Sequence, residues 1–144
     1  MIVLDTNVLL EIMRAKPDPA VLAWLDAQAP DDLWLSSVVA AELLFGVARL
    51  PEGARKQQLA TAVSAMLEQD FSGQILNFDL SAASVYAVML SERERVGQNM
   101  AMAEAHIAAI CLSRDAALAT RNTKHFEGLG LALINPWESH SAHP

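Results

Sequence analysis

Hydrophobic and polar positions follow two alternating patterns along the chain. Five short apolar runs have the length and composition of β-strands, and segments with helical spacing lie between most of them. The expected strands lie within 1–5, 31–37, 71–79, 116–120 and 131–135, and the expected helices within 6–14, 16–28, 38–50, 52–70, 81–96 and 100–112. This order predicts one α/β domain with a parallel sheet covered by helices on both faces.

Residues that cap helices mark several of the expected helix starts. Thr6 or Asn7 is expected to cap the first helix, and Asp18 the second. Ser36 or Ser37 is expected to cap the third. Because two of these caps directly follow apolar runs, the sequence predicts short strand-to-helix junctions with polar side chains at the strand ends.

Length and composition fit a single cytoplasmic domain. The chain has 144 residues, of which 53% are hydrophobic, so it is long enough to bury a core. No apolar run approaches the roughly 20 residues of a membrane-spanning helix. Asp5 interrupts the apolar start, and the single cysteine, Cys111, cannot form an intrachain disulfide. We expect a domain over residues 1–137, a polar tail over 138–144 and a location in the cytoplasm.

Three carboxylates occupy segments that are otherwise apolar or small. Asp5 ends the first apolar run, Glu42 lies within an expected helix, and Glu104 lies within the segment MAMAEAHIAAICL. An ionised carboxylate among apolar neighbours needs a basic partner, a raised pKa or a metal ion. Structural alternatives stay open for two of them: Asp5 as a helix cap, and Glu42 in an ion pair with Arg49. No lysine or arginine lies within one helical turn of Glu104, so its partner has to come from elsewhere in the fold or be a metal ion.

The end of the fourth expected strand adds an amide. In open parallel sheets the carboxyl ends of the strands form the functional edge, where Asn122 is expected to lie with Asp5, unless it only caps the short turn that follows. Three carboxylates and an amide oxygen suit Mg²⁺, or Mn²⁺, which prefer oxygen ligands and retain several waters. The histidines have no zinc spacing, and His106 is expected to be structural. The chain also lacks a phosphate-binding glycine loop and a GxSxG nucleophile motif. The pattern favours a metal-dependent site for phosphoryl transfer.

The charge balance bears on the substrate. A net charge of −7 argues against a large nucleic-acid footprint, although a carboxylate metal site inflates the acidic count. The ten basic residues fall in small groups, which are solvated surface in the simplest interpretation. The candidates for contacts to RNA phosphates are Arg14, Arg49, Arg121 and Lys124.

Four segments in order, MIVLDTNVLLEIM, LSSVVAAELLFGVARLP, AEAHIAAI and LATRNTKHFEGLGLALINPW, resemble a PIN-domain ribonuclease. More narrowly, the chain resembles the VapC/FitB-type toxins of bacterial toxin–antitoxin pairs from about residue 1 to 137. The resemblance implies a PIN-like three-layer domain whose five-stranded parallel sheet has the order 3-2-1-4-5. It also implies a homodimer and inhibition by a small VapB-like antitoxin that inserts a segment near the site.

The resemblance carries over residue by residue. The expected catalytic and metal-binding residues are Asp5, Glu42, Glu104 and Asn122. Polar positions that line or support such sites are matched by Thr6, Asn7 and Thr120. Two positions depart from the family pattern. The third acid is usually Asp but is Glu104 here, and His125 stands where relatives often carry Asp or Glu.

The sequence therefore predicts a metal-dependent endoribonuclease toxin that hydrolyses RNA phosphodiester bonds with Mg²⁺ or Mn²⁺. Two other classes stay open. A catalytically weakened PIN domain would serve only as an antitoxin-binding or regulatory module, and the departures at Glu104 and His125 favour it. The other class is a metal-dependent phosphatase. Asn7 counts against an aspartyl-phosphate enzyme, because the DxDx[TV] motif requires a second aspartate at that position.

Overall fold

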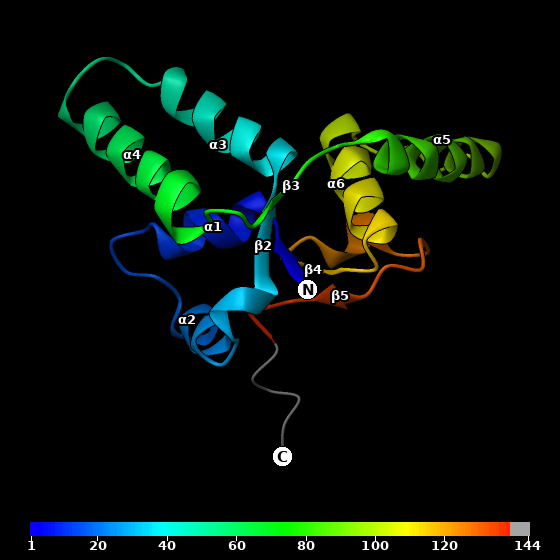
Figure 1. The fold of residues 1–144 in the computed structure, drawn as a ribbon, viewed down its shortest axis with the longest axis horizontal. Helices are drawn as coiled ribbons and strands as arrows, with labels where there is room; N and C mark the ends of the chain where they lie inside the picture. Colours follow the sequence, from blue (N-terminus) through cyan, green and yellow to red (C-terminus); the bar gives the residue numbers. More distant parts are fainter. Residues whose placement is uncertain (139–144) are drawn as a thin grey trace.

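The computed structural model describes residues 1–138. Within them the chain forms five strands, six α-helices and three short turns of other helical types (Figure 1). In chain order the elements are β1 (Ile2–Leu4), α1 (Thr6–Ile12), α2 (Pro19–Asp26), η1 (Pro30–Asp32), β2 (Leu33–Ser36), α3 (Ser37–Ala48), α4 (Ala54–Ala65), η2 (Met66–Asp70), β3 (Ile75–Leu76), α5 (Leu80–Arg95), α6 (Met102–Ser113), β4 (Ala117–Ala119), η3 (Thr123–Phe126) and β5 (Leu133–Ile134).

The five strands form one parallel sheet in the order β3-β2-β1-β4-β5, as the resemblance implied. The register pairs Leu4 of β1 with Ala119 of β4. The next residue on each strand is polar, so Asp5 and Thr120 leave the same edge of the sheet side by side. This register brings the carboxyl end of β1 and the carboxyl end of β4 into one site.

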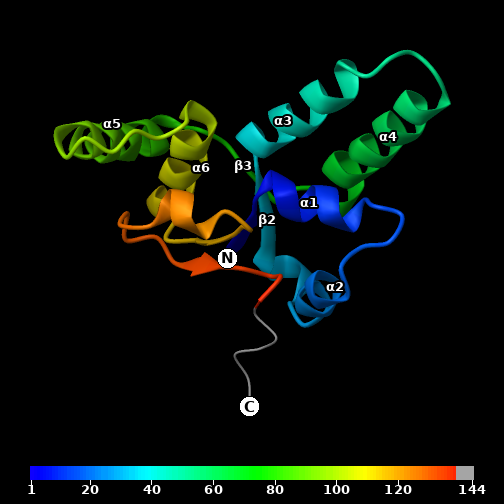
Figure 2. The ribbon, with the colours of Figure 1, turned by 180° about the vertical axis from the view of Figure 1, so that it is seen from behind.

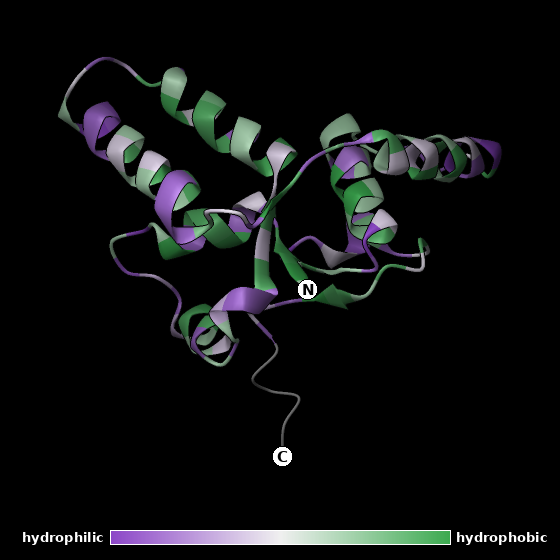
Figure 3. Ribbon diagram, in the orientation of Figure 1, coloured by the Kyte–Doolittle hydropathy of each residue, from purple (hydrophilic) through white to green (hydrophobic). Residues whose placement is uncertain are grey.

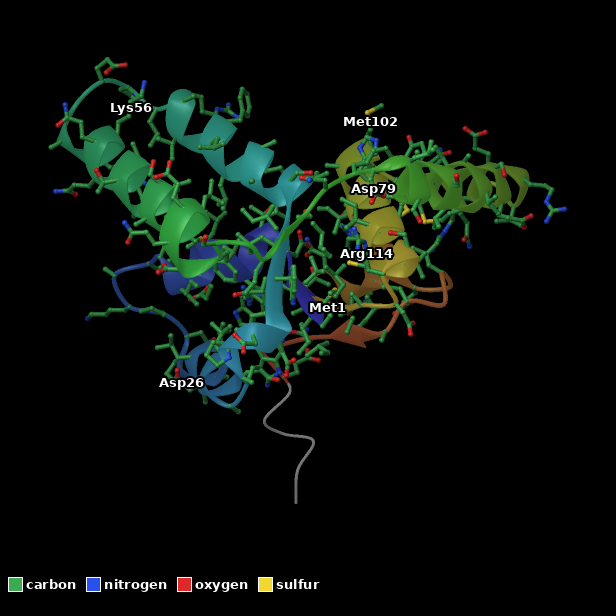
Figure 4. All side chains as sticks on the ribbon, in the orientation of Figure 1. Met1, Asp26, Lys56, Asp79, Met102 and Arg114 are labelled. Carbon is green, nitrogen blue, oxygen red and sulfur yellow. The ribbon has the colours of Figure 1, made fainter. Side chains whose placement is uncertain are left out.

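The helices lie on two sides of the sheet. In both views α3 and α4 run beside each other on one side, and α5 lies with α6 on the other (Figures 1 and 2). The first helix, α1, runs from the end of β1 toward α4. An exposed ion pair between Asp79 and Arg114 lies where α5 begins beside α6, far from Lys56 at the start of α4 (Figure 4).

The core lies between the sheet and its helices. Side chains from β1, β2, β4, α6 and η3 are fully buried in it, among them Leu4, Leu35, Leu118, Ile110 and Phe126. Figure 3 shows the same contrast, with hydrophobic residues along the strands and hydrophilic bands on α4. Burying one Leu or Phe side chain stabilises the folded state by roughly 1.5–3 kcal/mol. The apolar runs of the sequence therefore favour a sheet that is buried between the helices.

Two local predictions are corrected. The N-cap of α1 is Asp5, the alternative that the sequence left open, and not Thr6 or Asn7, because Asp5 keeps the extended conformation of β1 and its Oδ1 accepts a hydrogen bond from the Thr6 N–H. The helix expected over 52–70 begins later, at Ala54 after Gly53, whose φ of 148° favours glycine, and its last turn is a π-helix. The expected caps Asp18 and Ser36 are confirmed.

The remaining sequence expectations concern the tail and the membrane. Apart from Glu138, the polar tail predicted over 138–144 lies outside the described residues. In the part of the chain that the structure describes, no helix has the length and hydropathy needed to cross a membrane.

Candidate active site

A small pocket opens at the carboxyl ends of β1 and β4 and contains all four of the predicted site residues. Its volume is about 230 Å³. Residues from the end of β1, from α1, α3 and α6, and from the loop after β4 line it: Asp5, Thr6, Asn7, Leu10, Glu42, Ala103, Glu104, Ile107 and Asn122. Residues that are far apart in sequence therefore face one space of a few side-chain volumes.

Asp5 is the most deeply placed acid of the pocket. Only 7% of its surface is exposed. Its carboxylate accepts hydrogen bonds from the Thr6 backbone N–H at 2.8 Å and from the Thr120 hydroxyl at 2.8 Å. Burial raises the pKa of Asp5, these two hydrogen bonds act in the opposite direction, and the charges of Glu42 and Glu104 raise it further. Asp5 is thus both the cap of α1 and a carboxylate whose ionised form would gain from a cation.

The hydroxyl of Thr120 connects the end of β4 to α1. It is fully buried, and besides donating to Asp5 it accepts from Asn7 Nδ2 at 3.3 Å and from the Asn122 N–H at 3.0 Å. Asn7 Oδ1 in turn accepts from the Arg121 N–H at 3.2 Å. The residues expected to support the site therefore form one hydrogen-bond network beneath Asp5.

Glu42 reaches the pocket from α3 and is exposed. Its Oε1 accepts a 2.7 Å hydrogen bond from the hydroxyl of Thr6. The ion pair with Arg49, which the sequence left open, is not formed: the Arg49 guanidinium lies over the ring of Phe45, 5.4 Å from its centroid. Arg49 is the C-cap residue of α3, and its guanidinium stacks on Phe45 of the last turn of the same helix.

Glu104 lies in the first turn of α6 at the edge of the pocket. Its side chain is 23% exposed, and the partner that its own helix lacks is His125, whose Nδ1 is 2.6 Å from Glu104 Oε2. Of the two alternatives that the sequence left open for Glu104, a partner from elsewhere in the fold or a metal ion, the structure shows the first. His106, on the same helix, stacks on Tyr86 and meets the edge of Phe78, in agreement with the structural role expected for it.

Asn122 stands at the N-terminus of η3, but its side chain makes no capping hydrogen bond there. The cap interpretation is therefore not needed to explain it, and Asn122 lines the pocket instead. The predicted basic residues do not all lie together: Arg14 and Arg121 line one groove, whereas Arg49 and Lys124 do not. Arg14 binds Glu11 at 3.1 Å, Arg121 lies over the ring of Trp137 at 4.8 Å, and Lys124 is exposed on η3.

The donor set of the pocket fits a hard divalent cation. It offers carboxylate and amide oxygens and no sulfur. Among residues 1–138 no three His, Cys, Asp or Glu side chains converge tightly enough to form a ready-made ligand cluster. Mg²⁺ does not need one, because it usually binds one or two carboxylates directly and keeps several waters. In this arrangement Thr6 and His125 hold the two glutamates at the sides of the space.

Comparisons with known proteins agree with the fold. The model of the PIN domain matches residues 2–130. The chain is 42% identical to the VapC ribonuclease Y4jK of Sinorhizobium fredii over 96% of its own length and 99% of that protein. It is 39% identical to the toxin FitB of Neisseria gonorrhoeae, over 95% of the chain and 99% of FitB.

A solved structure shows the same likeness in three dimensions. The structure of FitAB bound to the IR36 DNA fragment superposes with a TM-score of 0.89 at 38% identity, covering 95% of this chain and 96% of that one. The family match spans most of the chain, and both relatives are aligned over almost their whole length. The chain belongs to the PIN-domain family, among its VapC/FitB-type toxins.

Proposed function

We propose that this chain is a metal-dependent endoribonuclease toxin that hydrolyses RNA phosphodiester bonds and is neutralised by a cognate small antitoxin. One observation carries the proposal: Asp5, Glu42, Glu104 and Asn122, from four separate parts of the chain, line one pocket at the carboxyl edge of a parallel sheet. The relatives named VapC ribonuclease and toxin FitB indicate the same activity class.

Asp5, Glu42 and Glu104 would hold Mg²⁺ or Mn²⁺ directly or through water, with Asn122 as a neutral oxygen donor. When bound, such an ion lowers the pKa of a water molecule and offsets the charge that develops on the phosphate. Asp5 supplies the buried negative charge, and the Thr120 hydroxyl and Thr6 N–H fix its two oxygens. Thr6 also orients Glu42, so one residue positions two acids.

Proton transfer from the attacking water requires a carboxylate at the rim of the pocket. Glu42 and Glu104 meet this requirement, since Glu42 is exposed and Glu104 is partly exposed. Asp5 is poorly suited to it, because both of its oxygens already accept hydrogen bonds and only 7% of its surface is exposed. We assign Glu42 or Glu104 as the general base and Asp5 as the buried ligand.

A second candidate function follows from the two departures of the family pattern. His125 occupies one oxygen of Glu104. If this contact keeps Glu104 from the cation, the chain is a weakened PIN domain that only binds an antitoxin.

The test is RNA cleavage with Mg²⁺ and with Mn²⁺ by the wild-type chain and by Glu42→Gln, Glu104→Gln and the surface control Glu68→Gln. The enzyme proposal predicts cleavage by the wild type and the control and at least a tenfold loss in the two pocket variants. No cleavage by any of them would support the binding module.

We also propose that the protein acts in the cytoplasm, as a homodimer, and that an antitoxin occludes the pocket. Several apolar side chains are exposed, and a dimer interface could bury them. They include Phe45 on α3 and Leu80 and Met102 at the starts of α5 and α6. Light scattering of the purified chain measures the dimer directly. Inhibition of RNA cleavage by the co-purified small partner measures the antitoxin.

A further inference from the structure

A second pocket, the α5 pocket, lies between α5, the end of α6 and the turn at Gly128. The residues that line it are all different from those of the acidic pocket. Its volume is about 730 Å³, which is typical of pockets that hold small organic molecules. One stripe of α5, from Ser84 to Arg93, forms most of its wall, and Leu112 of α6 and Leu129 also line it.

The wall of the α5 pocket is mainly apolar. Val85, Met89 and Leu112 line its inner side, where they also pack on the core of the domain. Two more lining residues, Val88 and Val96, are 67% and 62% exposed. An apolar chain that fills this hollow would remove both valines from water, which favours binding.

One positive charge at this wall has no acidic partner. Arg93 is half-buried, and its guanidinium donates to Gln98 Oε1 at 2.9 Å and to the backbone carbonyl of Glu127. Both acceptors are neutral, and among residues 1–138 Arg93 forms no ion pair with a carboxylate. The two hydrogen bonds hold the guanidinium at the wall and leave its other N–H groups for a ligand.

The acid that lines the α5 pocket already has a basic partner. Oε2 of Glu92 accepts from Nη2 of Arg95, and both side chains are more than half exposed. The next acid along the helix, Glu94, is exposed and does not line the pocket. Among the lining residues the charge without a partner is therefore positive, although the chain as a whole carries a net charge of −7.

We propose that the α5 pocket binds a small organic carboxylate with an apolar chain of about eight carbons. The carboxylate pairs with Arg93, because the planar fork of a guanidinium matches two carboxylate oxygens. The chain lies against Val88, Met89 and Leu112. A half-buried guanidinium is better compensated by an anion than by neutral oxygens. This binding site goes beyond the nuclease function, and neither proposal depends on the other.

A protein face is the other occupant to consider, because exposed valines also occur at interfaces. Size and charge favour a small molecule. The hollow has the volume of a single small-molecule site. One amphipathic molecule also supplies both the anion that Arg93 lacks and the apolar surface that would cover Val88 and Val96.

The test is isothermal calorimetry of the purified chain with octanoate as the probe. Butyrate keeps the carboxylate but shortens the chain, and octanamide keeps the chain but removes the charge. Octanoate is expected to bind, and the other two compounds are expected to bind at least about tenfold more weakly.

Two matched pairs of variants locate the site. Val88→Asp places a negative charge on the pocket wall, whereas Ala87→Asp places it on the preceding residue of α5, which is exposed and lies outside the pocket. Arg93→Gln is compared with Arg55→Gln, which removes the same charge from α4. Val88→Asp and Arg93→Gln are expected to raise the Kd for octanoate at least about tenfold, and both controls to leave it within about twofold.

Thermal melting confirms that each variant is folded. Because Val88 is 67% exposed, Val88→Asp tests the pocket even if loss of Arg93 loosens the turn at Gly128. No binding of octanoate by the wild type, or equal affinity in Val88→Asp and Ala87→Asp, would overturn the proposal. Octanamide that binds as tightly as octanoate would also overturn it, because the charge of Arg93 would then play no part.

Light scattering tests the alternative occupant. If Val88→Asp dissociates a dimer that Ala87→Asp preserves, the pocket belongs to a protein interface and the proposal fails. RNA cleavage is not a readout in any of these measurements, so failure of the carboxylate site and failure of the nuclease function are distinguishable.

Discussion

The ring of His125 reaches across from η3 to the carboxylate of Glu104 on α6, with 2.6 Å between Nδ1 and Oε2. His125 thereby fixes one oxygen of an acid that has no basic neighbour on its own helix. The other oxygen stays available to the pocket that Glu104 lines. We interpret His125 as a positioning residue for Glu104.

Replacement of His125 tests this interpretation. His125→Ala is expected to lower the affinity for Mn²⁺ about tenfold, because loss of a residue that orients a ligand usually costs 10- to 100-fold. Isothermal calorimetry measures the affinity, and Lys124→Ala on the same turn is the matched control. Mn²⁺ binding that is equal to or tighter than that of the wild type would contradict the role assigned to His125.

Thr6 offers a sharper comparison, because a conservative variant keeps its hydroxyl. Thr6→Ala removes the hydrogen bond to Glu42 and is expected to reduce kcat for RNA cleavage by at least about tenfold. Thr6→Ser retains the donor and is expected to remain within about threefold of the wild type. Equal loss in both variants would mean that the methyl group, and not the hydroxyl, matters at this position.

Thr120 is expected to matter for stability as well as for the site. Thr120→Val keeps the shape but deprives Asp5, Asn7 and Asn122 of a buried partner. Leaving such groups unsatisfied costs about 1–3 kcal/mol, which urea denaturation can measure. Thr61→Val is the control. The Thr61 hydroxyl is exposed and bonds only within α4, so its loss is expected to change the free energy of unfolding by less than about 0.5 kcal/mol.

The buried thiol of Cys111 gives a prediction about pH. Burial, and secondarily the charge of Asp5, raises the pKa of Cys111 to about 12. The folded state then holds the thiol proton over a range in which the unfolded chain releases it. Stability is therefore lost as pH rises from about 8.5 toward the folded value. Cys111→Ala is expected to lack this component.

At pH 8 the same burial is expected to protect Cys111 from thiol reagents. Labelling with a chromogenic disulfide should follow global unfolding in urea and be negligible in the native protein. Rapid labelling of the folded chain would show that the helix α6 opens locally or that the thiol is exposed.

The sequence predicted the positions of the elements and the acids for a physical reason. Apolar runs that end at a polar residue mark buried strands, and parallel strands place those ends at one edge. Asp5, Glu42 and Glu104 could be found because each carboxylate interrupts an apolar segment. The strand order came from the family resemblance and not from the hydrophobic pattern, which is the same for several parallel topologies.

Contacts between distant side chains could not be predicted in this way. The pairing of Glu104 with His125 depends on how the turn η3 folds back beneath α6. The cap of α1 was ambiguous because Asp5, Thr6 and Asn7 are all good capping residues in succession. The α5 pocket depends on bringing the turn at Gly128 next to α5 and α6, and no local pattern records that approach.

Asp5 is the residue on which the account depends most, and a single isosteric change tests it. Asp5→Asn keeps an oxygen that can accept from the Thr6 N–H, so the cap of α1 can persist while the charge is removed. The measurement is the rate of RNA cleavage with Mg²⁺ or Mn²⁺ by the wild type and by Asp5→Asn, each with and without EDTA. The account predicts cleavage by the wild type that EDTA abolishes, and a rate at least about 100-fold lower in the folded variant. Equal rates for the two proteins, or wild-type cleavage that persists in EDTA, would contradict it.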